Sequence, residues 1–113
     1  MTTYLSNEDI HKLLPMGAAI DVLDDLFRQE AKGLVENIPR KRRRFEGGGS
    51  GTLMGGVVLG SRAYGVRNSY QSLLHDTETG KLLAIIEPSA VAWIRTGAAS
   101  GVATKYMALP DAS

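Results

Sequence analysis

Asp76-Thr77-Glu78-Thr79-Gly80-Lys81-Leu82-Leu83-Ala84-Ile85-Ile86-Glu87 combines a tight turn with an apolar strand. The residues from Asp76 to Gly80 are small or polar and favour a turn, and the apolar run Leu82–Ile86 is followed by Pro88. A second run, Ser72–His75, precedes the turn. Two such runs, joined by a short loop that ends in glycine, predict a β-hairpin. His75 and Asp76 border the turn, and we interpret them as turn residues rather than as a catalytic pair.

The β pattern continues upstream of this hairpin. The segment Thr52–Leu59 predicts a strand, and its glycines indicate a bulge or a close backbone approach. Gly47–Gly51 predicts a flexible turn that separates this strand from the basic run Arg40–Arg44. Further strand-forming residues are Tyr64, Val66 and Tyr70.

Two helices are predicted before the sheet. Ser6 and Asp9 have the spacing of a capping box, and Pro15 interrupts the helix that they begin. A second helix is expected from about Pro15 or Met16 to Lys32, with Gly33 just beyond its end. Its apolar stripe, interpreted as core, is Ile20, Leu23, Phe27 and Ala31, and its opposite face carries Asp21, Asp24, Asp25 and Arg28.

A third helix, rich in small residues, is predicted around Arg95–Thr104 and should end near Ala108, before Pro110. Its two glycines each cost about 1 kcal/mol relative to alanine, so close packing or a ligand must offset them. We expect the helix to begin directly after Arg95. A guanidinium, the Thr96 hydroxyl and free backbone amides would then face one anion, such as a carboxylate or phosphate. In the alternative, Arg95 pairs with Glu87.

Together these elements predict an α+β fold with two N-terminal helices, an antiparallel sheet and a C-terminal small-residue helix. The chain has 113 residues, 43% hydrophobic and 22% charged, which suits one small globular domain.

The absence of cysteine excludes disulfides, thiolate nucleophiles and sulfur-ligated zinc. His11 and His75 lack ligand spacing, so no metal site is expected. No apolar run is long enough to span a membrane and no signal peptide is evident, so we expect a soluble, cytoplasmic protein.

Positive charge is concentrated in the middle of the chain. Residues 39–67 carry a net charge of +6, although the whole chain carries only +1. If Arg40–Arg44 is a strand, Arg40, Arg42 and Arg44 share one face, and some of them could reach a ligand anion. The run could also be a solvated basic edge, or an RNA-binding segment. The near-neutral net charge and the lack of interleaved aromatic residues argue against nucleic acid.

Two motifs give the chain a family resemblance. The turn and strand Asp76–Glu87, with its D-x-x-T-G pattern, precede Arg95-Thr96-Gly97-Ala98-Ala99-Ser100, which has the pattern R-T-x-A-A-S. This pair of motifs resembles the ornithine cyclodeaminase/mu-crystallin family. Earlier in the chain, the family's order is also matched by Tyr4–Ile10, Pro39-Arg40 and Met54. The resemblance covers essentially all of residues 1–113.

The resemblance implies the N-terminal portion of a longer enzyme. In the family this portion builds an open antiparallel sheet for dimerisation and for one wall of the substrate site, and a Rossmann domain that binds NAD or NADP follows it. Residues 1–113 are thus expected to be the substrate-binding and dimerisation part of such an enzyme, truncated before the nucleotide-binding domain. Family members cyclodeaminate an amino acid, as an ammonia-lyase does, or act as imine reductases or amino acid dehydrogenases.

Three cations surround the substrate carboxylate in the family, and the resemblance places them at Arg40, Arg67 and Arg95. Arg42 could fill the slot of Arg40, and Thr96 is a possible supporting residue. Arg67 stands where the family has a lysine, and the segment Arg67–Asp76 is shorter than usual. No catalytic residue is assigned, since the family's catalytic aspartate lies outside the matched portion.

The resemblance implies that this chain binds a small amino or imino acid substrate, forms a homodimer and contacts no membrane. We expect it to be inactive alone and to bind no nicotinamide cofactor by itself, because it has no G-x-G-x-x-G motif. The alternatives are a non-catalytic binding or oligomerisation module or a decayed gene product and, least favoured, a small basic-patch RNA-binding protein.

Overall fold

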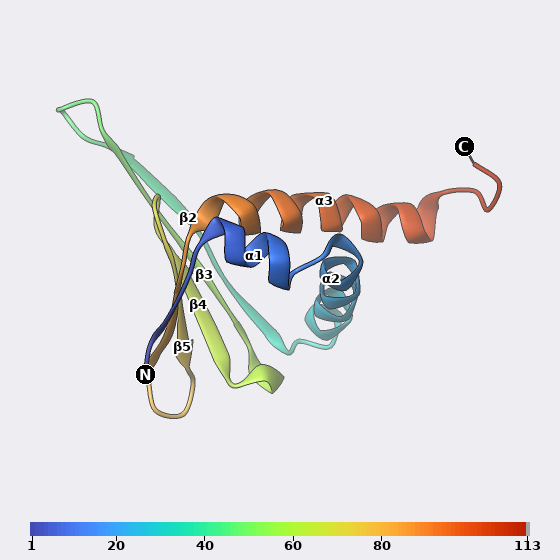
Figure 1. The fold of residues 1–113 in the computed structure, drawn as a ribbon, viewed down its shortest axis with the longest axis horizontal. Coiled ribbons are helices and arrows are strands. Elements are labelled where there is room, and N and C mark those ends of the chain that lie inside the picture. Colours follow the sequence, from blue (N-terminus) through green and yellow to red (C-terminus); the bar gives the residue numbers. More distant parts are fainter. Residues whose placement is uncertain (113) are drawn as a thin grey trace.

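The computed structural model describes residues 1–112 as one sheet with three helices on one side of it (Figure 1). The helices are α1 (Asn7–Leu13), α2 (Met16–Ala31) and α3 (Pro88–Met107). The strands are β1 (Thr3–Leu5), β2 (Val35–Arg44), β3 (Ser50–Val58), β4 (Ala63–Arg67), β5 (Ser72–Asp76) and β6 (Leu82–Ile86), and a short 3-10 helix, η1 (Leu59–Ser61), joins β3 to β4. The predicted α+β fold is confirmed.

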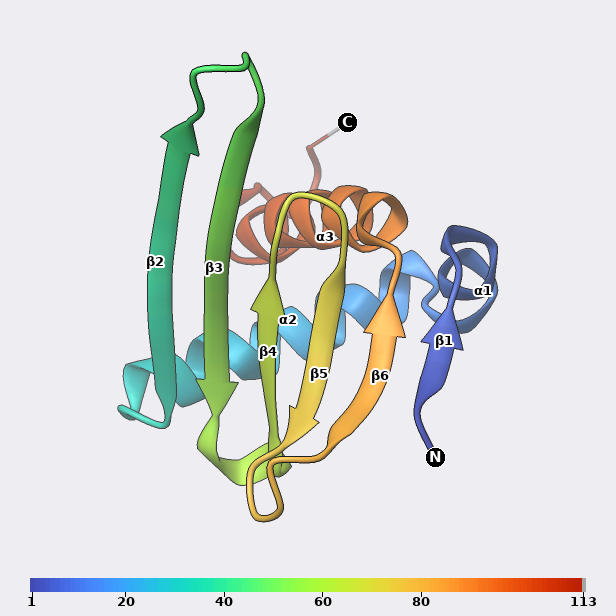
Figure 2. The same cartoon turned by 90° about the vertical axis from the view of Figure 1, so that its left-hand side faces the viewer.

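The sheet is a meander with one added strand. Its order is β1-β6-β5-β4-β3-β2, and every pair is antiparallel except β1 with β6. In Figure 2 the β2–β3 hairpin extends well past the other strands, and α3 passes behind the upper part of the sheet. The turn of that hairpin is shorter than predicted, because Ser50 and Gly51 already belong to β3.

The predicted β5–β6 hairpin is confirmed, and so is the role of its turn residues. Asp76 Oδ1 accepts hydrogen bonds from the amides of Glu78 and Thr79 at 2.7 and 2.9 Å. Gly80 adopts a φ of +72°, which glycine tolerates without the steric cost of a Cβ. His75 stacks on Tyr64 with a centroid separation of 4.9 Å. Tyr70, predicted among the strand formers, lies in the bend between β4 and β5 instead.

The small core lies where the three helices meet the β1–β6 edge of the sheet. Its buried residues are Ile10, Ala19, Ala90, Ile94 and Ala98, against which Leu5, Leu14, Ile20, Leu23, Ile86 and Val91 pack. The capping box of α1 is present, since Ser6 Oγ accepts from the Asp9 amide and Asp9 Oδ2 accepts from the Ser6 amide. Gly33 follows α2 with a φ of +74°, as predicted.

The glycines of α3 are explained by close packing against α2. A Cβ on Gly101 would lie 2.7 Å from Cδ1 of Ile20, and a Cβ on Gly97 would lie 3.1 Å from Cε of Met16. The backbones of the two helices can approach this closely only because these positions have no side chain. Of the two explanations left open by the sequence, contact between helices therefore accounts for both positions.

The prediction for the polar face of α2 is wrong at Asp24. The Asp24 side chain is only 12% exposed and lies under the end of α3. It accepts hydrogen bonds from Lys105 Nζ at 2.7 Å and from the Tyr106 hydroxyl at 2.9 Å, and Arg28 Nε lies 3.3 Å away. Phe27 and Ala31, expected in the core, are exposed, and both line an open groove between α2 and the end of α3.

Candidate functional site

Three neighbouring strands present a cation or a thioether on the face of the sheet that the helices cover. Arg40 is on β2, Met54 on β3 and Arg67 on β4. Met54 and Arg67 are direct partners across the β3–β4 ladder. Arg40 Nη2 lies 3.9 Å from Sδ of Met54, although a bulge between Ile38 and Lys41 interrupts the β2–β3 register. The bulge includes Pro39, which has no amide hydrogen to donate to the ladder.

Arg95 joins this group from α3. Burial lowers the pKa of the Arg67 guanidinium, and the positive charges of Arg95 and Arg40 lower it further. Arg40 on β2 and Arg95 on α3 are therefore near enough to Arg67 for their charges to act on it. An arginine remains protonated near neutral pH even when its pKa falls, so the cluster keeps its positive charge. A bound anion would relieve the repulsion within it.

The predicted helix start at Arg95 is wrong. The helix α3 begins at Pro88, seven residues earlier, because proline is well suited to the first turn of a helix. One amide of its first turn is occupied, since the Ala90 amide donates to Oδ1 of Asn7 at 2.9 Å. Arg95 therefore offers its guanidinium from within the helix, without free backbone amides beside it.

Two other predictions about this helix can be checked. The Thr96 hydroxyl donates to the carbonyl of Ala92 at 2.7 Å, and Thr96 does not line the hollow described next. The alternative pairing of Arg95 with Glu87 is absent among residues 1–112. Glu87 accepts instead from the Tyr4 hydroxyl and the Asn7 amide, at 2.8 and 2.7 Å.

A hollow of about 600 Å³, which we call the arginine hollow, lies over Arg40 and Arg67. Its volume is within the range of small-molecule sites. Its lining residues are Arg40, Arg42, Gly48, Gly49, Ser50, Thr52, Met54, Arg67, Asn68, Ser69 and Tyr70. None of them is acidic. Within the described part of the chain, no salt bridge joins Arg40, Arg42, Arg67 or Arg95 to a carboxylate.

The sequence prediction missed the polar rim of this hollow. Ser69 Oγ accepts from the Thr52 amide at 3.1 Å, and Asn68 Oδ1 accepts from the amides of Tyr70 and Gln71 at 2.8 Å each. These bonds fix the bend between β4 and β5 against β3. The Asn-Ser pair at the end of a strand is a turn signal, but only the sheet order places it opposite the basic run.

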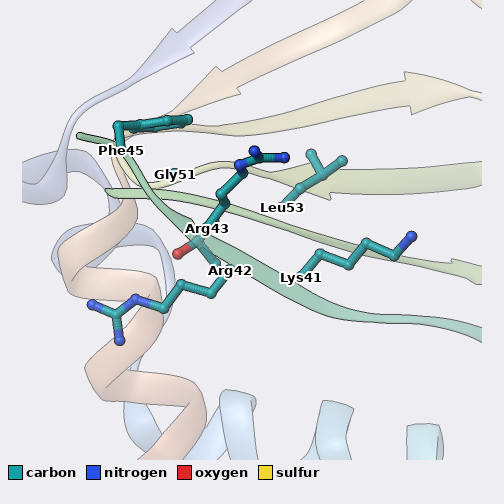
Figure 3. Close-up of a pocket in the computed structure, with 7 residues that line it drawn as sticks. Lys41, Arg42, Arg43, Phe45, Gly51 and Leu53 are labelled. Atoms are coloured by element: carbon teal, nitrogen blue, oxygen red, sulfur yellow. The ribbon is translucent and has the colours of Figure 1, made fainter. Parts of the chain in front are cut away.

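The basic run divides between the two faces of β2 as its strand period predicts. In Figure 3, Arg42 points to the other side of the strand from Arg43, which lies near Leu53 and Phe45. A second hollow, of about 710 Å³, lies here and is lined by Lys41, Arg42, Arg43, Phe45, Gly51, Thr52 and Leu53, so Arg42 borders both hollows. Both interpretations of the run thus describe part of it: all five residues are exposed, and Arg40 and Arg42 also line the arginine hollow.

Neither a dinucleotide site nor a metal cluster is formed by residues 1–112. The sheet is antiparallel apart from β1, and no glycine-rich turn connects a strand to a helix in the manner of a dinucleotide fold. The described residues bring together no three His, Asp or Glu side chains that could hold a metal ion. None of the three helices is both long and apolar enough to cross a membrane.

The structure is thus an α+β domain with a hollow lined by Arg40, Arg42 and Arg67, and Arg95 of α3 lies near Arg67 without lining that hollow. The chain belongs to the ornithine cyclodeaminase/mu-crystallin family, whose model matches residues 1–113.

Sequence and structural similarity to characterised or solved proteins supports this assignment. The alanine dehydrogenase of Archaeoglobus fulgidus is 28% identical over 125 residues, which cover 99% of this chain and 38% of that protein. The Thermococcus litoralis Delta(1)-pyrroline-2-carboxylate reductase, solved with NADH and L-proline, is 30% identical with a TM-score of 0.85, over 98% of this chain and 39% of that one. A probable ornithine cyclodeaminase from Bordetella pertussis, 21% identical, shares the fold with a TM-score of 0.91, over 100% of this chain and 39% of that one. This chain therefore spans about two-fifths of the length of these relatives.

Proposed function

We propose that residues 1–113 form the substrate-binding and dimerisation part of an NAD(P)-dependent enzyme of this family, acting on a small amino or imino acid. Family membership supports the class of enzyme, and the relatives that are dehydrogenases or reductases support the substrate class. Cyclodeamination and imine reduction both remain within this proposal, since both begin with a substrate that has a carboxylate beside the reacting carbon.

The proposal is supported by two observations: Arg40 and Arg67 line one hollow, and Arg95 on α3 lies near enough for its charge to lower the pKa of Arg67. A guanidinium can hold a carboxylate through two parallel N–H···O bonds, which fix the orientation of the acid as well as its position. Guanidinium groups from two strands and a helix would contact the carboxylate from different directions. The substrate would then bind in one orientation, with its reacting carbon always on the same side of the site. Arg67 acts there as a fixed charge and not as a proton donor, because arginine does not deprotonate near neutral pH.

The nicotinamide cofactor, NAD or NADP, accepts or supplies the hydride when it is bound in such enzymes. Solved relatives contain NAD or NADH. Because residues 1–112 do not form a dinucleotide site, we expect this chain alone to bind the acid but not the cofactor, and to carry out no turnover.

The face of the sheet away from the helices fits a dimer interface. It presents Ile38, Leu53, Val66, Leu73 and Ile85, which no helix covers, and Leu53 is 52% exposed. An apolar face of this kind is typical of a protein interface. An archaeal alanine dehydrogenase of 28% identity is described as a dimer. We infer that two copies of this chain meet through this face.

An NMR titration of the chain with L-alanine and L-proline tests the binding proposal. Both acids should bind, and Arg95→Gln should weaken each by about tenfold or more, because a charge-assisted pair is lost. Arg44→Gln removes the same charge from an exposed position of β2 that does not line the hollow, and should leave both affinities unchanged. Binding that is absent, or equally affected by both variants, would refute the carboxylate clamp.

A further inference from the structure

The arginine hollow holds more positive charge than a single carboxylate requires. Arg42 lines it together with Arg40 and Arg67, and Arg95 adds its charge from α3. Arg42 lies two residues beyond Arg40 on the same side of β2, about 7 Å further along the strand. Arg42 therefore lies beside the proposed site of the substrate carboxylate, which is formed by Arg40, Arg67 and Arg95, and is not part of that site.

The surroundings of Arg42 are suited to an anion. Ser50, Thr52 and Ser69 also line this end of the hollow, and their hydroxyl groups can donate hydrogen bonds. The lining contains no aspartate or glutamate that could neutralise Arg42, and among residues 1–112 no carboxylate forms a salt bridge with it. A substrate side chain that ends in an ammonium group would therefore meet like charge with no compensating acid.

We infer that the substrate is a dicarboxylic amino or imino acid, whose second carboxylate is bound by Arg42 while its first lies among Arg40, Arg67 and Arg95. The inference rests on the proposed function, since it names the substrate class of the same hollow. It makes Arg42 a specificity-determining residue. It also assigns separate roles to Arg40 and Arg42, which the family resemblance treats as alternatives for one slot.

Three five-carbon amino acids provide a matched test, because L-glutamate, L-norvaline and L-ornithine differ mainly in the charge of the side chain. In NMR titrations of the whole chain, L-glutamate should bind about tenfold or more tightly than L-norvaline, as expected for an added charge-assisted contact. L-ornithine should bind more weakly than L-norvaline. The four-carbon pair L-aspartate and L-2-aminobutyrate tests whether a shorter acid shows the same preference.

Variants of β2 then locate the preference. Arg42→Gln should weaken L-glutamate by about tenfold and largely remove its advantage over L-norvaline, whereas Arg42→Lys should retain part of it. Arg43→Gln makes the same change in net charge on the opposite face of the strand and should keep the full preference. A preference that survives in Arg42→Gln would overturn the assignment of Arg42.

The outcomes separate the two proposals. If L-norvaline binds through Arg95 and neither dicarboxylic acid binds more tightly than its uncharged partner, the dicarboxylate inference is wrong and the carboxylate clamp stands. If none of these acids binds in an Arg95-dependent way, the proposed function fails, and the inference fails with it.

Discussion

At the scale of single residues, Gly101 and Gly97 differ in how much room their neighbours can give. A Cβ on Gly101 would meet Cδ1 and Cγ1 of Ile20 at 2.7 and 2.8 Å, whereas a Cβ on Gly97 would meet the flexible end of Met16 at 3.1 Å. Gly101→Ala should therefore destabilise the fold by about 1–3 kcal/mol through overpacking, despite the better helix propensity of alanine.

Gly97→Ala is the matched control in the same helix. Met16 can rotate away, so the gain in helix propensity should bring this variant within about 1 kcal/mol of the parent. Urea unfolding of both variants measures the difference. Equal stabilities for the two alanine variants would show that Ile20 does not restrict the packing of α3.

Asp24 shows how the fold should respond to acid. Hydrogen bonds from Lys105 and Tyr106, with the charges of Lys105 and Arg28, lower the pKa of Asp24 in the folded state. Its stabilising contribution is thus fully present above the pKa of an unfolded aspartate and is lost as pH falls through the lower, folded-state value. Asp24→Asn should lower the urea midpoint at pH 7, and this deficit should shrink toward pH 3. A deficit of the same size at both pH values would contradict this linkage.

At the scale of elements, Asn7 caps a helix to which it does not belong. Its Oδ1 accepts from the amide of the buried Ala90, so α1 holds the first turn of α3 in place. Asn7→Ala should cost about 1–2 kcal/mol of unfolding free energy, the usual loss for a helix cap. Asn37→Ala, on the exposed part of β2, serves as the control and should change little. Equal effects of the two changes in denaturant unfolding would refute the capping role.

The sequence predicted well the elements whose signals are local. The capping box at Ser6, the stop at Gly33 and the turn at Asp76–Gly80 each depend on residues within one turn. The start of α3 was misplaced because the small residues after Arg95 are more conspicuous than Pro88, which marks the true first turn. The strand β1 was missed because three residues carry no periodic signal, and its pairing partner β6 lies about eighty residues away.

At the scale of the whole molecule, the proposed dimer depends on the outer face of the sheet. Val66 lies in the middle of this face, opposite Gly55 and Leu73 on the neighbouring strands. A charge buried there without a partner is costly, so Val66→Glu should weaken the dimer by about a hundredfold or more. Sedimentation measurements check this, with Thr77→Glu in the exposed turn as the control. A parent chain that stays monomeric, or a Val66→Glu chain that stays dimeric, would exclude this interface.

The candidate site could be predicted only in part, because it depends on the order of the strands. The family resemblance assigns Arg40, Arg67 and Arg95 to the site through motifs, because residues 27 or more positions apart carry no local signal that they meet. The resemblance offers Arg42 only as an alternative to Arg40, and no local pattern places Ser69 beside them. The register of Met54 with Arg67 and the passage of α3 across the sheet bring these residues together.

The most direct test of the central claim observes the guanidinium groups themselves. Nitrogen-15 NMR of the arginine Nε–H groups can be followed while L-norvaline is added to the chain. The signals of Arg40, Arg67 and Arg95 should shift together and saturate with one dissociation constant. Those of Arg28 and Arg43, which neither line the hollow nor affect the pKa of Arg67, should stay in place. A shift of only one of the three, or equal shifts of all the arginines, would contradict a shared carboxylate site.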